Sequence, residues 1–374
     1  MKKLIRAGLF AAAVAALLPV LILTAAGAIR EAGASREADA VRDVQPPAAE
    51  PVITHEAAFT SDPTTFPAEA AAECLPAATE SAVLWDTLQT VRLLTDDGLR
   101  TLPLSDYLIG VVMQELPAGF SPDAVAAQAV AARTFALRQQ AGGKHDGCVC
   151  DSAACCQAWR EPDADADPAW AALVADAVAQ TDGQVLTYDD ALIDATFFSC
   201  SGGRTEDAVA VWGGDVPYLV SVDSPGEESA PRYQAIVEIP SADFRRIVQA
   251  GCPGVWLSGT PEEWFGEITY TAGGGVASVQ LGGQAVTGTA LRSLLGLNST
   301  CFTIDAADDV IRLETLGFGH RVGMSQYGAD AMARAGADWT QILAHYYPGT
   351  VLTDADRSVV KVVQASHAGT AIYG

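Results

Sequence analysis

Two adjacent helices, whose boundaries are marked within residues 105–143, constrain the fold most strongly. In the first, SDYLIGVVMQEL, Ser105 is suited to cap the N-terminus because its hydroxyl accepts a hydrogen bond from a free amide. Side chains at spacings of three and four share one face, and these are Leu108, Val111, Val112 and Glu115. Pro117 ends the helix just beyond. The segment therefore predicts an amphipathic helix whose apolar face carries one carboxylate.

The second helix, over residues 121–143, has a signal at each end. Ser121 is a good N-cap, Pro122 fits the first helical position, and Gly142-Gly143 ends the helix. Its alanine-rich interior, AVAAQAVAARTFAL, permits close packing against a neighbour. Gln128 and Arg133 are its notable polar residues.

The remaining segments mix helices and strands without the regular βα alternation of a doubly wound sheet. A helix is expected over residues 167–183, followed by two strands joined by a turn at Asp189-Asp190. Further strands and short helices are expected over residues 232–314. A glycine-rich loop follows and leads into the last two helices. We predict an α+β fold of mixed helices and antiparallel strands in one elongated domain over residues 83–363, with a tail over residues 364–374.

The N-terminus predicts export. Three basic residues precede an uncharged run over residues 7–29, and about 20 apolar residues suffice to cross a bilayer. With the basic flank inside, the domain lies outside the cytoplasmic membrane. The length of the run favours a single-pass anchor over residues 1–30, and the small residues of LTAAGA leave a cleaved signal peptide as the alternative. Residues 31–82, rich in Ala, Pro, Asp and Glu, are expected to form a disordered acidic linker.

The net charge of the chain bears on which kinds of molecule it can bind. Acidic residues outnumber basic ones by 46 to 22, for a formal net charge of −24. No basic stripe offsets this charge, and polyanions are attracted by basic patches. The composition therefore argues against nucleic acid as a partner.

Glu115 raises a chemical question because a charged carboxylate is costly on an apolar helix face. An unperturbed glutamate has a pKa of about 4.3. Burial disfavours the charged form and raises the pKa toward the range of a general acid. The competing interpretation is a structural ion pair, for which Arg133 is the candidate. The residues alone leave both interpretations open.

A cysteine-rich loop follows the second helix. HDGCVCDSAACCQAW contains His145, Cys148, Cys150, Cys155 and Cys156. Thiolates and an imidazole at short spacing suit Zn²⁺, whereas an exported location favours disulfides. The spacing does not decide between them, and zinc is slightly favoured.

The glycine-rich segment GHRVGMSQYGA is a third candidate for chemistry. Its glycines free the backbone to bring His320, Ser325, Gln326 and Tyr327 near a ligand. A serine nucleophile with His320 as base deserves consideration. The segment around Ser325 lacks the final glycine of a nucleophile elbow, which argues against that mechanism.

Together these segments resemble the stage II sporulation protein D family. The resemblance runs from about Leu94 to Pro348 and rests on motifs in the family's order: YLIGVVMQELP, AVAAQAVAARTFAL, CCQAW, FFSCSGGRTED, VWGGDVPYLVSVDSP, LRSLLGLNST and GFGHRVGMSQYGA. Several independent motifs in one order make chance implausible. The family's Gly-His-Gly is Gly319-His320-Arg321 here, which places a bulky cation beside the histidine.

The resemblance implies a membrane-anchored lytic transglycosylase that cleaves peptidoglycan glycan strands stripped of stem peptides during engulfment in sporulation. The family's catalytic glutamate falls on Glu115. It is expected to act first as acid and then as base, because the sugar's own 6-hydroxyl attacks the anomeric carbon and leaves a 1,6-anhydro-muramoyl end. Glycoside hydrolases, by contrast, usually need a second carboxylate.

Other roles follow from the same resemblance. Polar side chains expected to hold the glycan are Gln128, Arg133, Ser201, Thr205, His320, Ser325, Gln326 and Tyr327. The metal ligands implied for zinc are His145, Cys150 and Cys156, although Cys148 and Cys155 leave the set ambiguous. No organic cofactor is expected.

Relatives called amidase enhancers share the motifs, so the alternative is a non-catalytic peptidoglycan-binding protein that stimulates a partner amidase. Expected partners are the glycan strands, a cell-wall amidase and, as a further candidate, a membrane scaffold protein.

Overall fold

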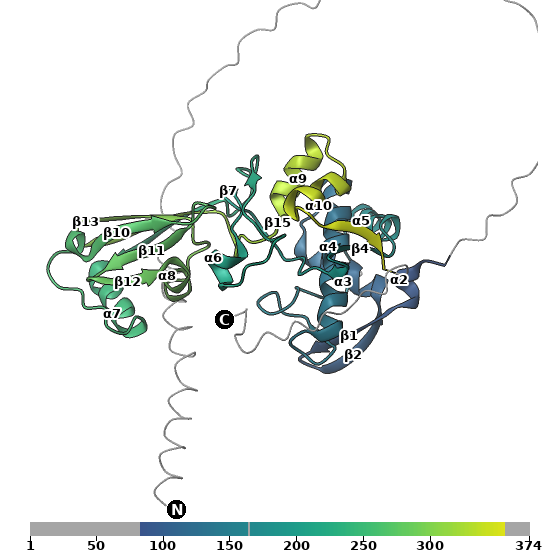
Figure 1. The fold of residues 1–374 in the computed structure, drawn as a ribbon, viewed down its shortest axis with the longest axis horizontal. Coiled ribbons are helices and arrows are strands. Elements are labelled where there is room, and N and C mark those ends of the chain that lie inside the picture. Colours follow the sequence, from purple (N-terminus) through teal and green to yellow (C-terminus); the bar gives the residue numbers. More distant parts are fainter. Residues whose placement is uncertain (1–82, 164, 356–374) are drawn as a thin grey trace, which may run out of the picture. The chain divides into compact units, whose positions relative to one another are not determined.

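The computed structural model describes residues 83–163 and 165–355, which belong to one compact unit of helices and mostly antiparallel strands (Figure 1). The predicted mixture of helices and antiparallel strands is confirmed. The expected anchor over residues 1–30, the linker over residues 31–82 and the tail over residues 364–374 lie outside the described residues. Within the described ranges, no helix has the length and apolar character needed to span a membrane.

A β-hairpin precedes the glutamate-bearing helix. β1 (Thr90–Thr95) pairs antiparallel with β2 (Gly98–Pro103) and in parallel with the short β3 (Val149–Cys150). Alternate β1 side chains, Val91 and Leu93, are fully buried, as period-two alternation requires. The pairing to β3 attaches the start of the cysteine-rich loop to this hairpin.

Helix α3 (Leu104–Glu115) begins where β2 ends, with Pro103 at its N-cap and the extended Leu116 after its last residue. The predicted cap at Ser105 is wrong, because the abrupt strand-to-helix junction starts the helix earlier. The Ser105 hydroxyl instead donates to the Asp106 carboxylate (3.3 Å).

Helix α4 (Pro122–Gly142) lies at the centre of the first hydrophobic core. Its predicted boundaries are confirmed, with Ser121 at the N-cap and Gly143 at the C-cap, although the Ser121 side chain makes no capping hydrogen bond. Its alanines from Ala124 to Ala136 are almost completely buried, and small side chains let helices approach closely. The helices that pack around it are α3, α5 (Pro168–Gln180), α9 (Gln326–Arg334) and α10 (Trp339–Tyr346).

Short strands complete this part of the fold. The predicted turn at Asp189-Asp190 is confirmed, and both residues have the left-handed φ that such a hairpin turn requires (49° and 61°). The remaining short elements are α2 (Trp85–Leu88), β4 (Gln184–Tyr188), β5 (Ala191–Leu192), β6 (Phe197–Phe198), β7 (Gly203–Arg204), α6 (Ala208–Trp212), β8 (Asp223–Ser224), β15 (Met324–Ser325) and β16 (Val351–Asp354). β15 pairs in parallel with β6, and this pairing places the start of α9.

A second hydrophobic core lies between residues 237 and 313. Two three-stranded antiparallel sheets, β13-β14-β9 and β10-β11-β12, form it with α7 and α8 (Figure 1). The elements are β9 (Gln234–Pro240), α7 (Ser241–Gly251), η1 (Pro261–Trp264), β10 (Phe265–Tyr270), β11 (Val276–Leu281), β12 (Gln284–Thr287), α8 (Gly288–Leu295), β13 (Phe302–Ala307) and β14 (Val310–Leu316). The strands and short helices expected over residues 232–314 are present.

A buried arginine ties the loop before β11 to the glycine-rich segment. Arg321 Nη1 lies 3.1 Å from Glu206 Oε1, and both side chains are 1% exposed. Its other nitrogens donate to the carbonyls of Ser201, Arg204 and Gly273. Arg321 has a φ of 69°, a conformation that a non-glycine residue adopts only when its surroundings enforce it.

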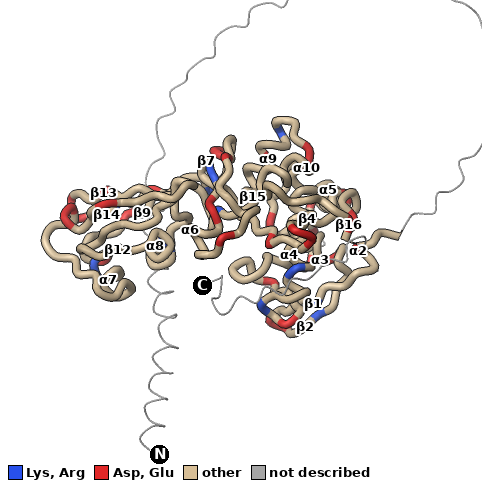
Figure 2. The backbone as a smooth tube through the Cα atoms, viewed as in Figure 1, with Lys and Arg blue, Asp and Glu red and all other residues tan. Residues whose placement is uncertain are grey.

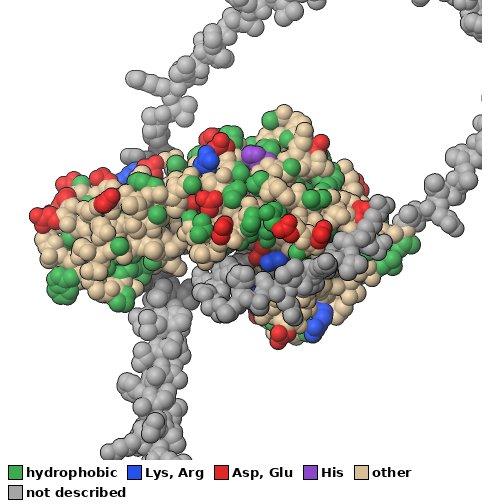
Figure 3. Space-filling model, in the orientation of Figure 1, with side chains coloured by type: hydrophobic (Ala, Val, Ile, Leu, Met, Phe, Trp, Pro, Cys, Tyr) green, Lys and Arg blue, Asp and Glu red, His purple; other side chains and the backbone are tan. Residues whose placement is uncertain are grey.

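Acidic residues occur on many elements, and basic residues are fewer (Figure 2). Figure 3 shows Asp and Glu spread over the visible face among a smaller number of Lys and Arg. Such a surface repels polyanions and favours ligands of low negative charge.

Candidate active site

Glu115 is the last residue of α3, and its half-buried carboxylate is held by two neutral donors. The backbone amide of Ala158 donates to Oε1 at 2.8 Å. The side-chain amide of Gln326, the first residue of α9, donates to Oε2 at 3.3 Å. Three segments far apart in the sequence therefore meet at one carboxylate.

Burial raises the pKa of Glu115, and the hydrogen bonds from Ala158 and Gln326 act in the opposite direction. No ion pair within the described part of the chain includes Glu115. The proton on this glutamate is thus favoured by its surroundings, which is the condition a general acid needs.

Arg133 is not the partner of Glu115. Its guanidinium is fully buried and reaches Asp86 at 2.6 Å. It also donates to the hydroxyl of Thr181 and to the carbonyls of Val178 and Gln184. The ion-pair interpretation of Glu115 and the predicted contact of Arg133 with a glycan are both wrong, because Arg133 is committed to joining α2, α4 and α5.

The cysteine-rich loop gathers four possible metal ligands. The ligand atoms of His145, Cys150, Cys155 and Cys156 all lie within 4.8 Å of one another. The three predicted ligands are therefore brought together, and Cys155, with its sulfur 3.2 Å from His145 Nε2, joins them. Cys148 is outside the group. None of the described cysteines forms a disulfide.

This donor set fits Zn²⁺ by its chemistry. Structural zinc sites commonly use three cysteines and one histidine, and zinc–sulfur bonds of about 2.3 Å place tetrahedral ligands roughly 3.8 Å apart. Burial, with Cys150 and Cys155 close by, raises the pKa of the Cys156 thiol to about 12. A bound dication reverses that preference, because it stabilises the thiolates.

The same loop connects the cysteine cluster to Glu115. Gln157 and Ala158 directly follow Cys156, and Ala158 supplies the donor to the carboxylate. Gln157 is buried, accepts a hydrogen bond from Tyr107 (3.0 Å) and donates to the carbonyl of Ala132 (3.3 Å). The position of the Ala158 amide thus depends on the loop that carries the four ligands.

Ser325 stabilises the start of a helix. It is the N-cap of α9, and its fully buried hydroxyl accepts a hydrogen bond from the amide of Gly328 and donates to the carbonyl of Ser199. No hydrogen bond in the described ranges joins it to His320. The arrangement is a helix cap, so the serine nucleophile considered from the sequence is not assembled.

His320 is neutral at physiological pH. Burial, with a smaller contribution from Arg292, lowers its pKa to about 4. Its Nδ1 accepts a hydrogen bond from the amide of Val322 (3.1 Å), and its ring packs against Phe198 and Trp212. A neutral ring can shape a wall of the site or exchange a hydrogen bond with a ligand.

Two further predicted glycan contacts are used inside the protein. The buried Ser201 hydroxyl donates to Glu227 Oε2 (2.8 Å), and the buried Thr205 hydroxyl accepts from the amide of Val222 (2.8 Å). Both side chains hold loops together, and no residue pattern points to Glu227 as a partner of Ser201. These positions contradict the predicted contacts with a glycan.

Gln128 differs from these residues. Its side chain is fully buried in α4, yet neither amide atom has a hydrogen-bond partner among the described residues. A buried amide without a partner is costly, and a water or ligand is the usual explanation. Gln128 therefore remains available for a bound molecule.

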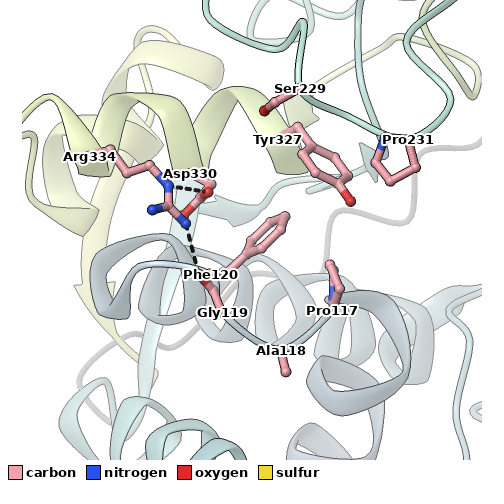
Figure 4. Close-up of a pocket in the computed structure, with 9 residues that line it drawn as sticks. All are labelled: Pro117, Ala118, Gly119, Phe120, Ser229, Pro231, Tyr327, Asp330 and Arg334. Carbon is pink, nitrogen blue, oxygen red and sulfur yellow. Dashed lines mark hydrogen bonds and ion pairs between the residues drawn. The ribbon is translucent and has the colours of Figure 1, made fainter. Parts of the chain in front are cut away.

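An open pocket of about 320 Å³ begins two residues beyond Glu115 (Figure 4). Pro117 and Phe120 form one side, and Tyr327, next to Gln326 in the chain, forms the other. The rings of Phe120 and Tyr327 meet edge to face with centroids 5.0 Å apart. Tyr327 is therefore at a ligand-accessible surface, in contrast to Ser201 and Thr205.

Sequence reasoning missed the Ala158 amide, Gln157 and Tyr107. A backbone donor leaves no signal in residue type, but the motif CCQAW, which contains Gln157 and Ala158, was recognised. The choice of Cys155 over Cys148 also required the loop's conformation.

Comparison with known proteins agrees with the motifs. Residues 97–188 match the family model described as stage II sporulation protein, a segment that includes Glu115 and the cysteine cluster. Stage II sporulation protein D of Bacillus subtilis is 38% identical over 304 residues, which cover 78% of this chain and 84% of that protein. The chain belongs to the stage II sporulation protein D family.

Other relatives extend the match. The stage II sporulation protein D of Bacillus amyloliquefaciens is 37% identical, over 71% of this chain and 79% of its own length. An amidase enhancer of Bacillus subtilis is 27% identical over 66% of this chain but only 40% of its own length. Family membership thus agrees with the arrangement around Glu115 and indicates a role connected with sporulation and the cell wall.

Proposed function

We propose that this chain is a peptidoglycan lytic transglycosylase that acts on glycan strands stripped of stem peptides, with Glu115 as its single acid and base. The observation that carries the proposal is a half-buried carboxylate with a raised pKa, two neutral donors and no described ion-pair partner. A ligand-sized pocket that begins two residues further along the chain, at Pro117, adds support.

The proposed reaction balances with one carboxyl group. Protonated Glu115 gives its proton to the glycosidic oxygen as the bond from that oxygen to the anomeric carbon breaks. The 6-hydroxyl of the same muramoyl residue then bonds to the anomeric carbon and returns its proton to the Glu115 carboxylate. The products are a free 4-hydroxyl and a 1,6-anhydro end, so no water is consumed.

Asp330 is a poor second carboxylate for hydrolysis. It also lines the pocket, but its Oδ1 accepts from the amide of Ser121 and its Oδ2 from Arg334 Nε, both at 2.7 Å. A hydrolase needs a carboxylate free to activate water or attack the sugar. This engagement favours the one-carboxylate reaction.

Zinc would be held by His145, Cys150, Cys155 and Cys156. A site with four protein ligands is closed, so its bound metal supplies structural order and charge compensation in place of an activated water. Its effect on catalysis would run through the loop, because Ala158 must present its amide to Glu115. Gln326 orients the other carboxylate oxygen. Gln128 is fully buried, and its proposed role in substrate binding rests on its unpartnered amide.

The same proposal includes where in the cell the reaction takes place. The basic flank and the apolar run over residues 7–29 support a single-pass anchor at the cell membrane, with the domain outside and a role in engulfment. Membrane fractionation with N-terminal sequencing tests it, and a soluble protein starting near residue 28 would contradict the anchor.

Glu115→Gln tests the catalytic proposal. Glutamine keeps the shape and polar contacts but has no acidic proton, so the variant should fold, bind glycan and lose about 10²–10⁴-fold in turnover. Gln114→Glu is a matched control, because it adds an exposed carboxylate one residue away and should keep turnover near the wild-type value. Wild-type turnover in Glu115→Gln would reject the site.

The second candidate function is a glycan-binding enhancer of a partner amidase, favoured by the match to an amidase enhancer. The purified domain would then cleave no glycan but would increase the rate of a cell-wall amidase. The two activities are measured separately, with denuded strands for the first and intact peptidoglycan plus amidase for the second.

A further inference from the structure

We propose that Glu227 is a positioning residue for Glu115: its buried carboxylate holds the start of α9 in the place from which Gln326 reaches the acid. This inference rests on the proposed function, because it concerns the same proton on Glu115. The effect runs through α9, since the hydrogen bonds that Glu227 accepts come from other residues.

The Glu227 carboxylate is 1% exposed and accepts hydrogen bonds from neutral donors. Its Oε2 accepts from the amides of Ser201 (2.6 Å) and Gly202 (3.0 Å) and from the Ser201 hydroxyl (2.8 Å). Its Oε1 accepts from the Ser224 hydroxyl (2.5 Å). An ionised carboxylate only accepts, so it satisfies all of these donors, whereas the NH₂ group of a glutamine cannot accept and leaves some of them unsatisfied.

The first turn of α9 lies directly against this carboxylate. Gly328 is the third residue of α9, and a Cβ there would lie less than 3.0 Å from Glu227 Oε1 and from Ser224 Oγ. The Tyr346 hydroxyl, 2.7 Å from Ser224 Oγ, would be equally close. Glycine therefore lets the helix backbone approach these oxygens, and a negative charge beside the first turn of a helix is favourable.

The loop fixed by this carboxylate also binds the start of α9. The carbonyl of Ser199, in the same loop, accepts hydrogen bonds from the amide of Tyr327 (3.0 Å) and from the Ser325 hydroxyl (3.3 Å). Gln326 lies between these two residues, so its backbone is held on both sides. Its side-chain amide then donates to Glu115 Oε2. A continuous set of contacts thus leads from the buried carboxylate to the acid.

The contact between Gln326 and Glu115 is the one most sensitive to a displacement of α9. Its length of 3.3 Å already exceeds the usual N–H···O range of about 2.7–3.2 Å, so a small movement removes it. Burial raises the pKa of Glu115 and this bond opposes the increase, so loss of the bond raises the pKa further. Tyr107 of α3 is a titratable side chain that senses the charge on Glu115, and burial keeps its hydroxyl protonated by raising its own pKa.

Glu227→Gln in the full-length protein tests the inference through the alkaline limb of kcat/KM, where Glu115 loses its proton. The limb should move to higher pH by about one unit, because a hydrogen bond to a charged group is lost. Gln326→Leu should give the same shift, and the double variant should shift no further, because both substitutions remove one bond. Tyr346→Phe is the matched control: it removes a hydroxyl from the same cluster without touching the bonds to Glu227, so it should leave the limb in place.

Gly328→Ala reaches the same oxygens from the helix side and should move the limb in the same direction, so it carries the test if Glu227→Gln does not fold. A folded Glu227→Gln protein with the wild-type limb would overturn the inference. Shifts that add in the double variant would also overturn it, since Glu227 would then act without Gln326.

NMR separates this inference from the catalytic proposal. Carboxyl signals of ¹³C-labelled glutamate report the pKa of Glu115 without turnover, and the Glu115 signal is assigned by its loss in Glu115→Gln. If the wild-type protein cleaves no glycan but Glu227→Gln raises this pKa, the positioning role stands and the transglycosylase does not. If the wild-type protein yields anhydro ends but Glu227→Gln leaves this pKa unchanged, only the positioning role fails.

Discussion

Glu115 and Glu206 are two carboxylates within the same compact unit, and their surroundings differ in one decisive respect. Glu206 is fully buried against the guanidinium of Arg321, with Thr271 and the amide of Gly275 as further donors to Oε1. Glu115 has two neutral donors, and no described cation pairs with it. A pocket begins two residues further along the chain, at Pro117. The first arrangement pairs the carboxylate with a buried cation, whereas the second leaves a proton available for transfer.

The largest expected effect is on stability, at the Glu206 site. Arg321→Met leaves a buried carboxylate without its cation and should lower the free energy of unfolding by about 3–5 kcal/mol. Arg312→Met removes an exposed pair, with 42% and 58% of the two side chains accessible, and should change it by about 0–1 kcal/mol. Urea unfolding measures both. If Arg321→Met and Arg312→Met lowered the free energy of unfolding equally, the cation beside Glu206 would not have the stabilising role that distinguishes Glu206 from Glu115.

The next effect concerns the cysteine cluster. Cys156→Ser should lose bound zinc and lower turnover by about 10–100-fold, since it releases the loop that presents Ala158. Cys148→Ser changes a buried cysteine of the same loop that lies outside the cluster, so it should retain both metal and activity. Metal analysis of the purified domain and a turnover assay check this expectation. A native Cys150–Cys156 disulfide in metal-free protein would contradict it.

A smaller effect is expected at Ser325. Ser325→Ala removes the cap of α9, so stability should fall by about 0.5–2 kcal/mol. Turnover should fall moderately and the type of product should stay the same. Trapping a covalent adduct on Ser325, together with complete loss of turnover in the alanine variant, would instead mark a nucleophile.

The smallest effect is a shift in pH dependence. Because burial raises the pKa of Glu115, the alkaline limb of kcat/KM should lie above the ordinary value of about 4.3. Gln326→Leu removes a donor that favours the carboxylate, so the limb should move to higher pH. A limb that stays in place, or moves to lower pH, would show that Gln326 does not tune this proton.

The raised pKa of Glu115 also determines whether the free energy of unfolding rises or falls with pH. The protonated form contributes full stabilisation below the unfolded pKa of about 4.3, and this contribution is lost as the pH rises through the folded pKa. Wild-type stability relative to Glu115→Gln should therefore decline as the pH rises across that window. Denaturant unfolding at a series of pH values measures the difference.

Local signals in the sequence predicted the elements well. Pro122 and Gly142-Gly143 bound α4, and Asp189-Asp190 form the expected turn, because caps and turns depend on near neighbours. Helix α3 was found, but its start was misplaced because the hairpin before it was not recognised.

The site itself was predicted only in part. Glu115 and Gln326 do meet, and three of the four clustered ligands were named. The partners of Arg133 and Ser201 were missed, because Asp86 and Glu227 reach them through the tertiary fold. Polar side chains in motif segments were assumed to face the glycan, whereas many of them hold the loops that shape the site.

Product analysis in heavy-oxygen water tests the one-carboxylate mechanism most directly. Denuded glycan strands are digested with the wild-type protein in H₂¹⁸O, and the new ends are identified by mass spectrometry. We expect 1,6-anhydro-muramoyl ends that contain no heavy oxygen, because the attacking oxygen belongs to the substrate. Reducing ends that carry the label would show that water attacks, and the mechanism centred on Glu115 alone would be contradicted.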